Sequence, residues 1–210
     1  MTDLAAENDR TTMPAESRVI HPLWVRASHG ISIVAVLVMI GSGWEIYNAS
    51  PLFSFTFPRG ITLGGWLAGA LLWHFAAMWL LVVSGGVYIV LGVVTGHFGN
   101  KLLPIRPRDV VTDIGAALTF RLSHDDLSVY NSVQKLFYVV AILAIVIVAL
   151  SGVAIWKPVQ FRELTLLFGG YDAARYVHFF AMAVIVGFLV VHIALAVIFP
   201  KSLRAMITGR

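Results

Sequence analysis

The chain has 210 residues, of which 59% are hydrophobic and only 12% charged, about half the charged fraction of a soluble domain. Lipid rather than water is therefore expected to cover most of the surface. The absence of cysteine excludes disulfides, iron–sulfur clusters and thiolate metal sites, and the net charge of +4, spread over the ends of apolar segments, excludes nucleic acid as a partner.

Residues 1–20 are polar and carry charges of both signs. We expect a disordered tail here rather than a signal peptide, because no short apolar core precedes a cleavage site. The remainder, residues 21–210, is expected to form one domain. A membrane crossing needs roughly 20 apolar residues, and long stretches without charge predict four such helices, near residues 23–45, 62–95, 132–156 and 173–199.

The fold class that follows is an all-α membrane protein, a bundle of four transmembrane helices. Most of the 15 Lys and Arg residues lie in the N-terminal tail, in the connection between the second and third helices, or at the C-terminus. The positive-inside rule therefore places both termini in the cytoplasm. Within that connection, residues 109–122 have apolar positions at helical spacing, which predicts a short amphipathic helix on the cytoplasmic surface.

Four of the seven histidines fall inside the predicted spans, where an ionisable side chain is costly and usually functional. His178 and His192 are 14 residues apart on the fourth helix, so both point roughly the same way with a rise of about 21 Å between them. His29 lies at the depth of His192, and His74 lies at the depth of His178. The sequence therefore predicts two cross-helix pairs, His29 with His192 and His74 with His178.

Paired neutral imidazoles on facing helices suit a haem iron, because they fill both axial positions. Copper or zinc would need further ligands at the same depth, and a proton or ion pathway would carry acidic or basic residues within the spans. Capping of each histidine by a Ser, a Thr or a backbone carbonyl is the alternative. Glycines at the same depths either make room for a flat macrocycle or serve helix contact, and they are Gly41, Gly43, Gly85 and Gly86.

Three stretches, HPLWVRASHG, YNSVQKLFY and RYVHFFAMAVIVGFLVVH, resemble the bacterial di-haem membrane cytochromes of the b561 type. The resemblance covers about residues 19–208 and extends to the b-type subunits of formate dehydrogenase, nickel–iron hydrogenase and thiosulfate reductase. It implies the bacterial inner membrane, and two haem b groups ligated by His29 with His192 and by His74 with His178. The family usually has an aromatic residue after the first of these histidines, where this chain has Gly30.

The resemblance also implies a quinone site beside the cytoplasmic haem, for which Asn131, Gln134 and Lys135 are candidates. Their alternative role is to cap the start of the third helix. Arg26 and Arg175 lie close to the two haem levels and are candidates to pair with propionates. Their alternative role is that of interfacial anchors.

Three functions are compatible with these patterns. The first is a di-haem b-type cytochrome subunit that transfers electrons between the quinone/quinol pool and a periplasmic oxidoreductase, with the PLFSFTFPRG connection contacting the partner. The second is a stand-alone superoxide:quinone oxidoreductase, to which the outer cations Lys157, Arg162 and Arg175 would attract superoxide. The third is a haem-free membrane anchor or transporter. The sequence leaves the direction of electron flow and any oligomerisation in the lipid bilayer open.

Overall fold

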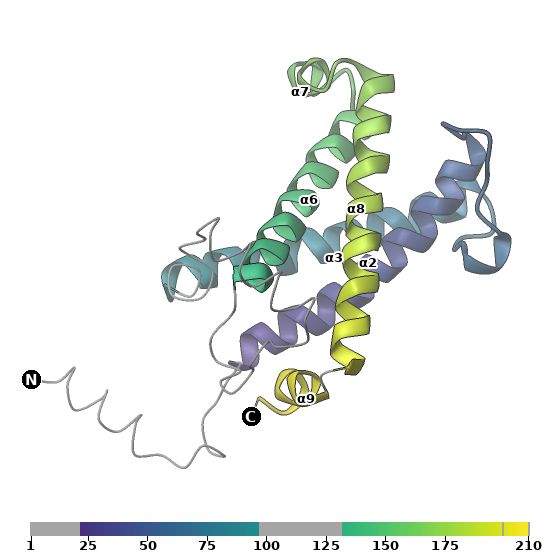
Figure 1. Ribbon diagram of the computed structural model, residues 1–210. Coiled ribbons are helices and arrows are strands. Elements are labelled where there is room, and N and C mark those ends of the chain that lie inside the picture. The colour runs from purple at the N-terminus through teal and green to yellow at the C-terminus, as the bar shows by residue number, and fades with distance from the viewer. Residues whose placement is uncertain (1–21, 97–131, 199, 210) are drawn as a thin grey trace, which may run out of the picture.

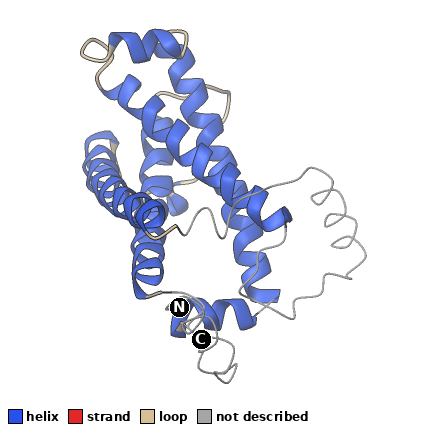
Figure 2. Cartoon of the chain, turned by 90° about the vertical axis from the view of Figure 1, so that its left-hand side faces the viewer, coloured by secondary structure: helices blue, strands red, loops and turns tan. Residues whose placement is uncertain are grey.

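The computed structural model describes residues 22–96, 132–198 and 200–209, and within them all regular structure is helical (Figures 1 and 2). Four helices are long and apolar enough to cross a membrane, which confirms the predicted fold class. They are α2 (Leu23–Ala49), α3 (Leu67–Val94), α6 (Ser132–Trp156) and α8 (Tyr171–Ile198). The predicted tail and the predicted helix over residues 109–122 lie outside the described residues.

Shorter helices complete the described chain, and the sequence analysis did not anticipate them. They are the 3-10 turn η2 (Arg59–Ile61), the helix α7 (Arg162–Leu167) and the helix α9 (Pro200–Thr208). We call the end of the bundle at which α2 begins and α8 ends the inner end, and the opposite end, where α7 lies, the outer end (Figure 1). Arg26 Nε donates a hydrogen bond of 3.1 Å to the carbonyl of Met206, which ties α9 to the start of α2.

The second long helix begins at Leu67, five residues later than the charge-free run suggested. The reason is a turn at Gly64 and Gly65, which have positive φ angles of 115° and 73°. A Cβ atom on Gly64 would lie 2.4 Å from the backbone of Ala70, so only glycine fits. Hydropathy alone does not detect this turn because its neighbours are as apolar as the helix.

The bundle consists of two helical hairpins, α2 with α3 and α6 with α8, and close helix contacts lie mainly within each hairpin. Small residues line these contacts and let the backbones approach closely, as in other membrane helices. Large apolar side chains point outward, where lipid would cover them. The buried small residues include Ala35, Ser42, Ala70, Ala77 and Ser84 in the first hairpin, and Ala144, Ser151, Ala154, Ala174 and Ala181 in the second.

Residues 50–66, which we call the strap, join α2 to α3 at the outer end and fold back along α2. The amide of Leu63 donates a 2.9 Å hydrogen bond to the carbonyl of Gly41. The side chain of Asn48 donates to the carbonyl of Phe57 at 2.9 Å and accepts from the amide of Phe57 at 2.8 Å. The strap is therefore fixed to α2 at two levels.

Candidate cofactor site

The structure places the four intramembrane histidines in two facing pairs. Towards the inner end, the ring centroids of His29 on α2 and His192 on α8 are 6.0 Å apart, with an angle of 64° between the ring planes. Towards the outer end, His74 on α3 and His178 on α8 are 6.4 Å apart, at 58°. These are the two pairs that the matched depths predicted. Each pair joins one hairpin to the other.

These separations fit a metal ion between two opposed imidazoles. A metal–nitrogen bond of about 2.0–2.1 Å, with the ring centre about 1.1 Å behind each nitrogen, requires centroids about 6.3 Å apart. Within the described ranges no group of three or more His, Cys, Asp or Glu side chains gathers around either pair. A donor set of only two imidazoles suits a haem iron, whose other four ligands come from the macrocycle.

Each outer histidine is held from behind by a serine of the same hairpin. The hydroxyl of Ser42 donates to the carbonyl of Val38 at 2.6 Å and lies 3.1 Å from Nδ1 of His74. With its single proton on that carbonyl, the hydroxyl can accept from Nδ1–H. That arrangement would favour the tautomer whose Nε2 lone pair is free for a metal.

The second hairpin repeats this arrangement. The hydroxyl of Ser151 donates to the carbonyl of Ile147 at 2.7 Å and lies 3.1 Å from Nδ1 of His178. The glycine after each serine also faces the ring: a Cβ on Gly43 would lie 3.5 Å from Cε1 of His74, and one on Gly152 would lie 3.2 Å from Cε1 of His178. Each of the two outer histidines is thus contacted by a Ser-Gly pair of its own hairpin.

Capping of the histidines by serine was one of the expected alternatives, but neither Ser42 nor Ser151 was assigned to a particular histidine, and Gly152 was not singled out. The available signal was the dipeptide Ser-Gly, present at residues 42–43 and 151–152 in the outward half of two apolar helices. Gly43 was expected to make room for a macrocycle or to serve helix contact, and in the structure it faces the ring of His74. Gly41 contacts Leu63 of the strap instead.

The inner pair is supported by different contacts. Phe188, one turn before His192 on α8, stacks on its ring with centroids 5.5 Å apart and planes 12° apart. Arg26, one turn before His29, directs its guanidinium to the carbonyls of Met206 and Ile207. The orientation of the His192 ring thus depends on stacking with Phe188, whereas the orientations of the His74 and His178 rings depend on hydrogen bonds.

An aromatic cluster lies at the outer end of the bundle and includes Phe179, the neighbour of His178 in the chain. Phe179, which follows His178, lies 5.3 Å from both Tyr47 on α2 and Phe53 in the strap, measured between ring centroids. Phe53 and Phe55 stack on one another with planes 3° apart, and both remain partly exposed. Ring contacts therefore run without a break from the outer surface to the residue beside a candidate ligand.

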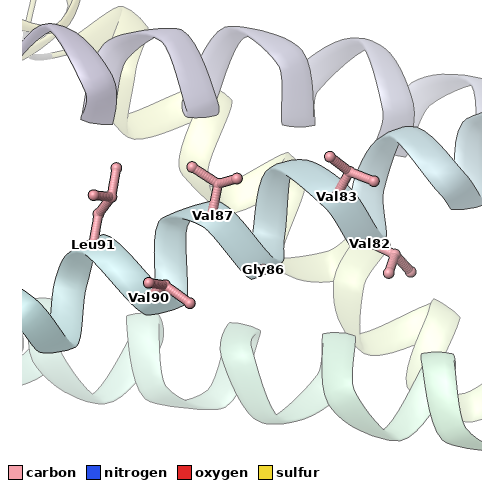
Figure 3. Close-up of a pocket in the computed structure, with 6 residues that line it drawn as sticks. All are labelled: Val82, Val83, Gly86, Val87, Val90 and Leu91. Atoms are coloured by element: carbon pink, nitrogen blue, oxygen red, sulfur yellow. The ribbon is translucent and has the colours of Figure 1, made fainter.

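A shallow apolar groove of about 390 Å³ runs along α3, and its lining residues are Val82, Val83, Gly86, Val87, Val90 and Leu91 (Figure 3). A Cβ atom on Gly85 or Gly86 would have no neighbour within 4 Å, so neither glycine serves helix contact in this structure. The lining includes none of the four histidines, and the groove is therefore distinct from the paired site.

The remaining candidates lie at the ends of the bundle. Arg175, near the outer end of α8, donates to the hydroxyl of Ser50 at 3.1 Å and to the carbonyl of the same residue. Gln134 and Lys135 lie in the first turn of α6 at the inner end, and Lys135 is half-buried. Asn131 lies outside the described residues.

Comparisons with known proteins give a family match and a similar protein. The model of the family described as prokaryotic cytochrome b561 matches residues 20–209. A relative from Azospira oryzae, named putative protein-methionine-sulfoxide reductase subunit YedZ1, is 49% identical over 197 residues. The aligned region covers 94% of this chain and all of the relative.

Proposed function

Because the chain belongs to the prokaryotic cytochrome b561 family, we propose that it holds two haem b groups and transfers electrons across the membrane between quinone and a redox enzyme at its outer end. The observation that carries the proposal is the presence of two histidine pairs at two depths of one bundle, with ring centroids 6.0 Å apart in one pair and 6.4 Å apart in the other. His29 and His192 would ligate the inner iron, and His74 and His178 the outer iron.

A haem iron bound in this way supplies one-electron Fe(III)/Fe(II) chemistry. Two imidazoles on each iron would leave no position open for oxygen or other small ligands. The Ser42 and Ser151 hydroxyls would hold the outer imidazoles in a ligating orientation. Family membership argues against the haem-free anchor or transporter.

The inner end is the proposed side for quinone exchange. By resemblance to quinone-linked relatives, Asn131, Gln134 and Lys135 would bind the quinone head group at the start of α6. Arg26 and Arg175 remain proposed partners of haem propionates. Each contacts backbone carbonyl groups in the structure, but a guanidinium carries five donors and retains others for a carboxylate.

The outer end is the proposed docking side for the enzyme partner. The Azospira relative is named as a subunit of a reductase of protein methionine sulfoxide, and we propose that this chain serves a catalytic subunit of that kind. The partly exposed rings of Phe53 and Phe55 begin the aromatic cluster that leads to His178. We further propose that the outer end faces the periplasm and the termini the cytoplasm, across the inner membrane.

The stand-alone superoxide enzyme has less support. It needs cations at the outer end to attract the anion. Arg175 binds Ser50, and the ammonium group of Lys157 lies over the Trp156 ring, 5.1 Å from its centroid, and both contacts leave the positive charge in place. The subunit role is favoured instead because the Azospira relative is named as a reductase subunit.

Haem content tests the proposal directly. The purified chain should contain two haem b per polypeptide by pyridine haemochrome assay, and a redox titration should resolve two components. A protein without reduced b-type Soret and α bands would overturn the proposal. One haem per chain would leave only one of the two pairs as a ligand set.

A further inference from the structure

Two arginines occupy the same position relative to the candidate ligands. Arg26 precedes His29 on α2 by three residues, and Arg175 precedes His178 on α8 by three residues. Three residues of helix turn through about 300° and rise about 4.5 Å, so each arginine lies on nearly the same side of its helix as its histidine and closer to the end of the bundle. The arrangement Arg-X-X-His therefore occurs once towards each end.

At the outer end, Arg175 binds the first hairpin. Its guanidinium donates to the carbonyl of Ser50 and, at 3.1 Å, to the hydroxyl of the same residue. Ser50 directly follows the last residue of α2, whereas Arg175 belongs to α8. The contact therefore joins the two hairpins three residues from a histidine of the outer pair.

At the inner end, Arg26 binds the second hairpin. Its Nε donates to the carbonyl of Met206 at 3.1 Å, and its Nη2 donates to the carbonyl of Ile207. Both carbonyls lie in the last turn of α9, which begins two residues after the end of α8. This contact joins the hairpins in the opposite sense, because here an arginine of the first hairpin reaches a helix of the second.

Both arginines bind the same kind of acceptor. The last carbonyl groups of a helix lack an intrahelical donor and carry the negative end of the helix dipole, so a cation is stabilising there. A guanidinium is a rigid, planar group that holds its N–H donors in a fixed geometry, whereas an ammonium group is a rotatable point charge. Each arginine therefore fixes the direction as well as the distance of a helix end in the other hairpin.

We propose that Arg26 and Arg175 are clamps, one at each end of the bundle, that hold the two hairpins in the arrangement in which the histidine pairs face one another. They are positioning residues, because the two histidines of each pair belong to different hairpins. Rotation of one hairpin against the other would change the angle between the ring planes, which is 64° in the inner pair and 58° in the outer pair. The effect on haem rests on the proposed function, whereas the clamps themselves need no cofactor.

Spin labels placed across the two hairpins test the clamps one end at a time. The labelled positions are strongly exposed, and they are Leu23 with Val197 at the inner end and Leu72 with Leu167 at the outer end. Arg26→Ala should broaden the distance distribution of the inner labels and leave that of the outer labels unchanged. Arg175→Ala should do the reverse, so each variant is a control for the other. Arg162→Ala removes an exposed cation of α7 and should change neither distribution.

Arg26→Lys and Arg175→Lys separate the clamp from the charge alone. Lysine keeps the positive charge but lacks the planar fork of donors. We expect distance distributions that are narrower than in the alanine variants and broader than in the unmodified protein. A distribution identical to that of the unmodified protein in both lysine variants would assign the effect to charge and overturn the clamps.

The ferric EPR spectrum gives a second readout, which a loss of stability alone would not change. The orientation of the axial ligands tunes the electronic structure of the iron. Arg175→Ala should alter the low-spin signal that is lost in His178→Ala, and Arg26→Ala should alter the other signal, with two haems per chain in both variants. Broader label distances with both signals unchanged would limit the arginines to docking the hairpins and overturn their role as positioning residues.

Unchanged label distances in both alanine variants would overturn the clamps and leave the proposed function intact. Absence of haem from the unmodified protein would instead overturn the proposed function, and the label distances would still test the clamps. If an alanine variant does not accumulate, the lysine variant at the same position decides, because its expected broadening is measured against the unmodified protein.

Discussion

At the scale of single residues, the histidines and the serines behind them have separate roles. The rings of His74 and His178 face one another across the hairpins, while the hydroxyls of Ser42 and Ser151 lie 3.1 Å from their Nδ1 atoms. Loss of such a supporting hydrogen bond typically weakens metal binding about 10–100-fold, whereas loss of the ligand removes the site. The histidines could be predicted from depth alone, because ionisable groups are rare in lipid. The serines could not, because hydroxyls are common in membrane helices.

Substitution of single ligands separates the two sites. His178→Ala should lower the haem content from two to one per chain and leave the inner component, because the outer iron loses an axial ligand. His192→Ala should retain the outer component instead. The measurements are the haem-to-protein ratio and the reduced α-band spectrum at low temperature. If His178→Ala retained both haems, the pairing of His74 with His178 would be wrong.

At the scale of elements, the strap shows how a connection can be as ordered as the helices it joins. Its backbone is bound to α2 at Gly41 and Asn48, and its phenylalanines form the aromatic cluster with Tyr47 and Phe179. The unexpected short helices α7 and α9 are similar in this respect. Thr165 of α7 is buried and donates to the carbonyl of Ala154 at 3.2 Å. These contacts depend on tertiary structure, so hydropathy could locate the long spans but not the elements between them.

Removal of the amide that holds the strap should loosen it without unfolding the bundle. Asn48→Ala loses both hydrogen bonds to Phe57, which together are worth about 1–3 kcal/mol. Opening of the strap should then become about 5–150-fold more frequent, because each 1.4 kcal/mol is a factor of ten. Limited chymotrypsin digestion from the outer face would measure it as faster cleavage after Phe53 or Phe55.

Asn48→Asp is the matched control, since it keeps the acceptor for the Phe57 amide and should give an intermediate rate. Haem content should stay at two per chain in both variants. Equal cleavage rates in the unmodified protein and Asn48→Ala would show that the strap is held by its aromatic contacts alone.

At the scale of the whole molecule, the two hairpins meet at the histidine pairs, at the aromatic cluster and at the contact of Arg175 with Ser50. Close backbone contacts lie mainly within α2–α3 and within α6–α8, whereas these side-chain contacts cross from one hairpin to the other. The cofactors would therefore join the two halves, and the free energy of haem binding would contribute to their docking.

Haem depletion should loosen the two hairpins relative to one another. The chain has no cysteine, so spin labels can be introduced at chosen pairs of sites. Labels at Leu37 on α2 and Val190 on α8, both exposed, should give a broader distance distribution after haem is removed. Labels at Leu143 on α6 and Val190, within one hairpin, should change little. Equal broadening in both pairs would mean that haem stabilises each hairpin rather than their docking.

The Ser-Gly pair that occurs once in each hairpin has a consequence for the ancestry of the chain. One histidine supported in this way in each hairpin is the pattern that duplication of a two-helix unit would leave, with the two hairpins related by an axis along the membrane normal. The position 14 residues after His74 is Tyr88, where the other half has His192. The position 13 residues before Ser151 is Tyr138, where the first half has His29. A symmetric ancestor would have had the same residue at the inner positions of α2 and α6, and the same residue at the inner positions of α3 and α8. The present chain has histidine on α2 and α8 and tyrosine on α3 and α6.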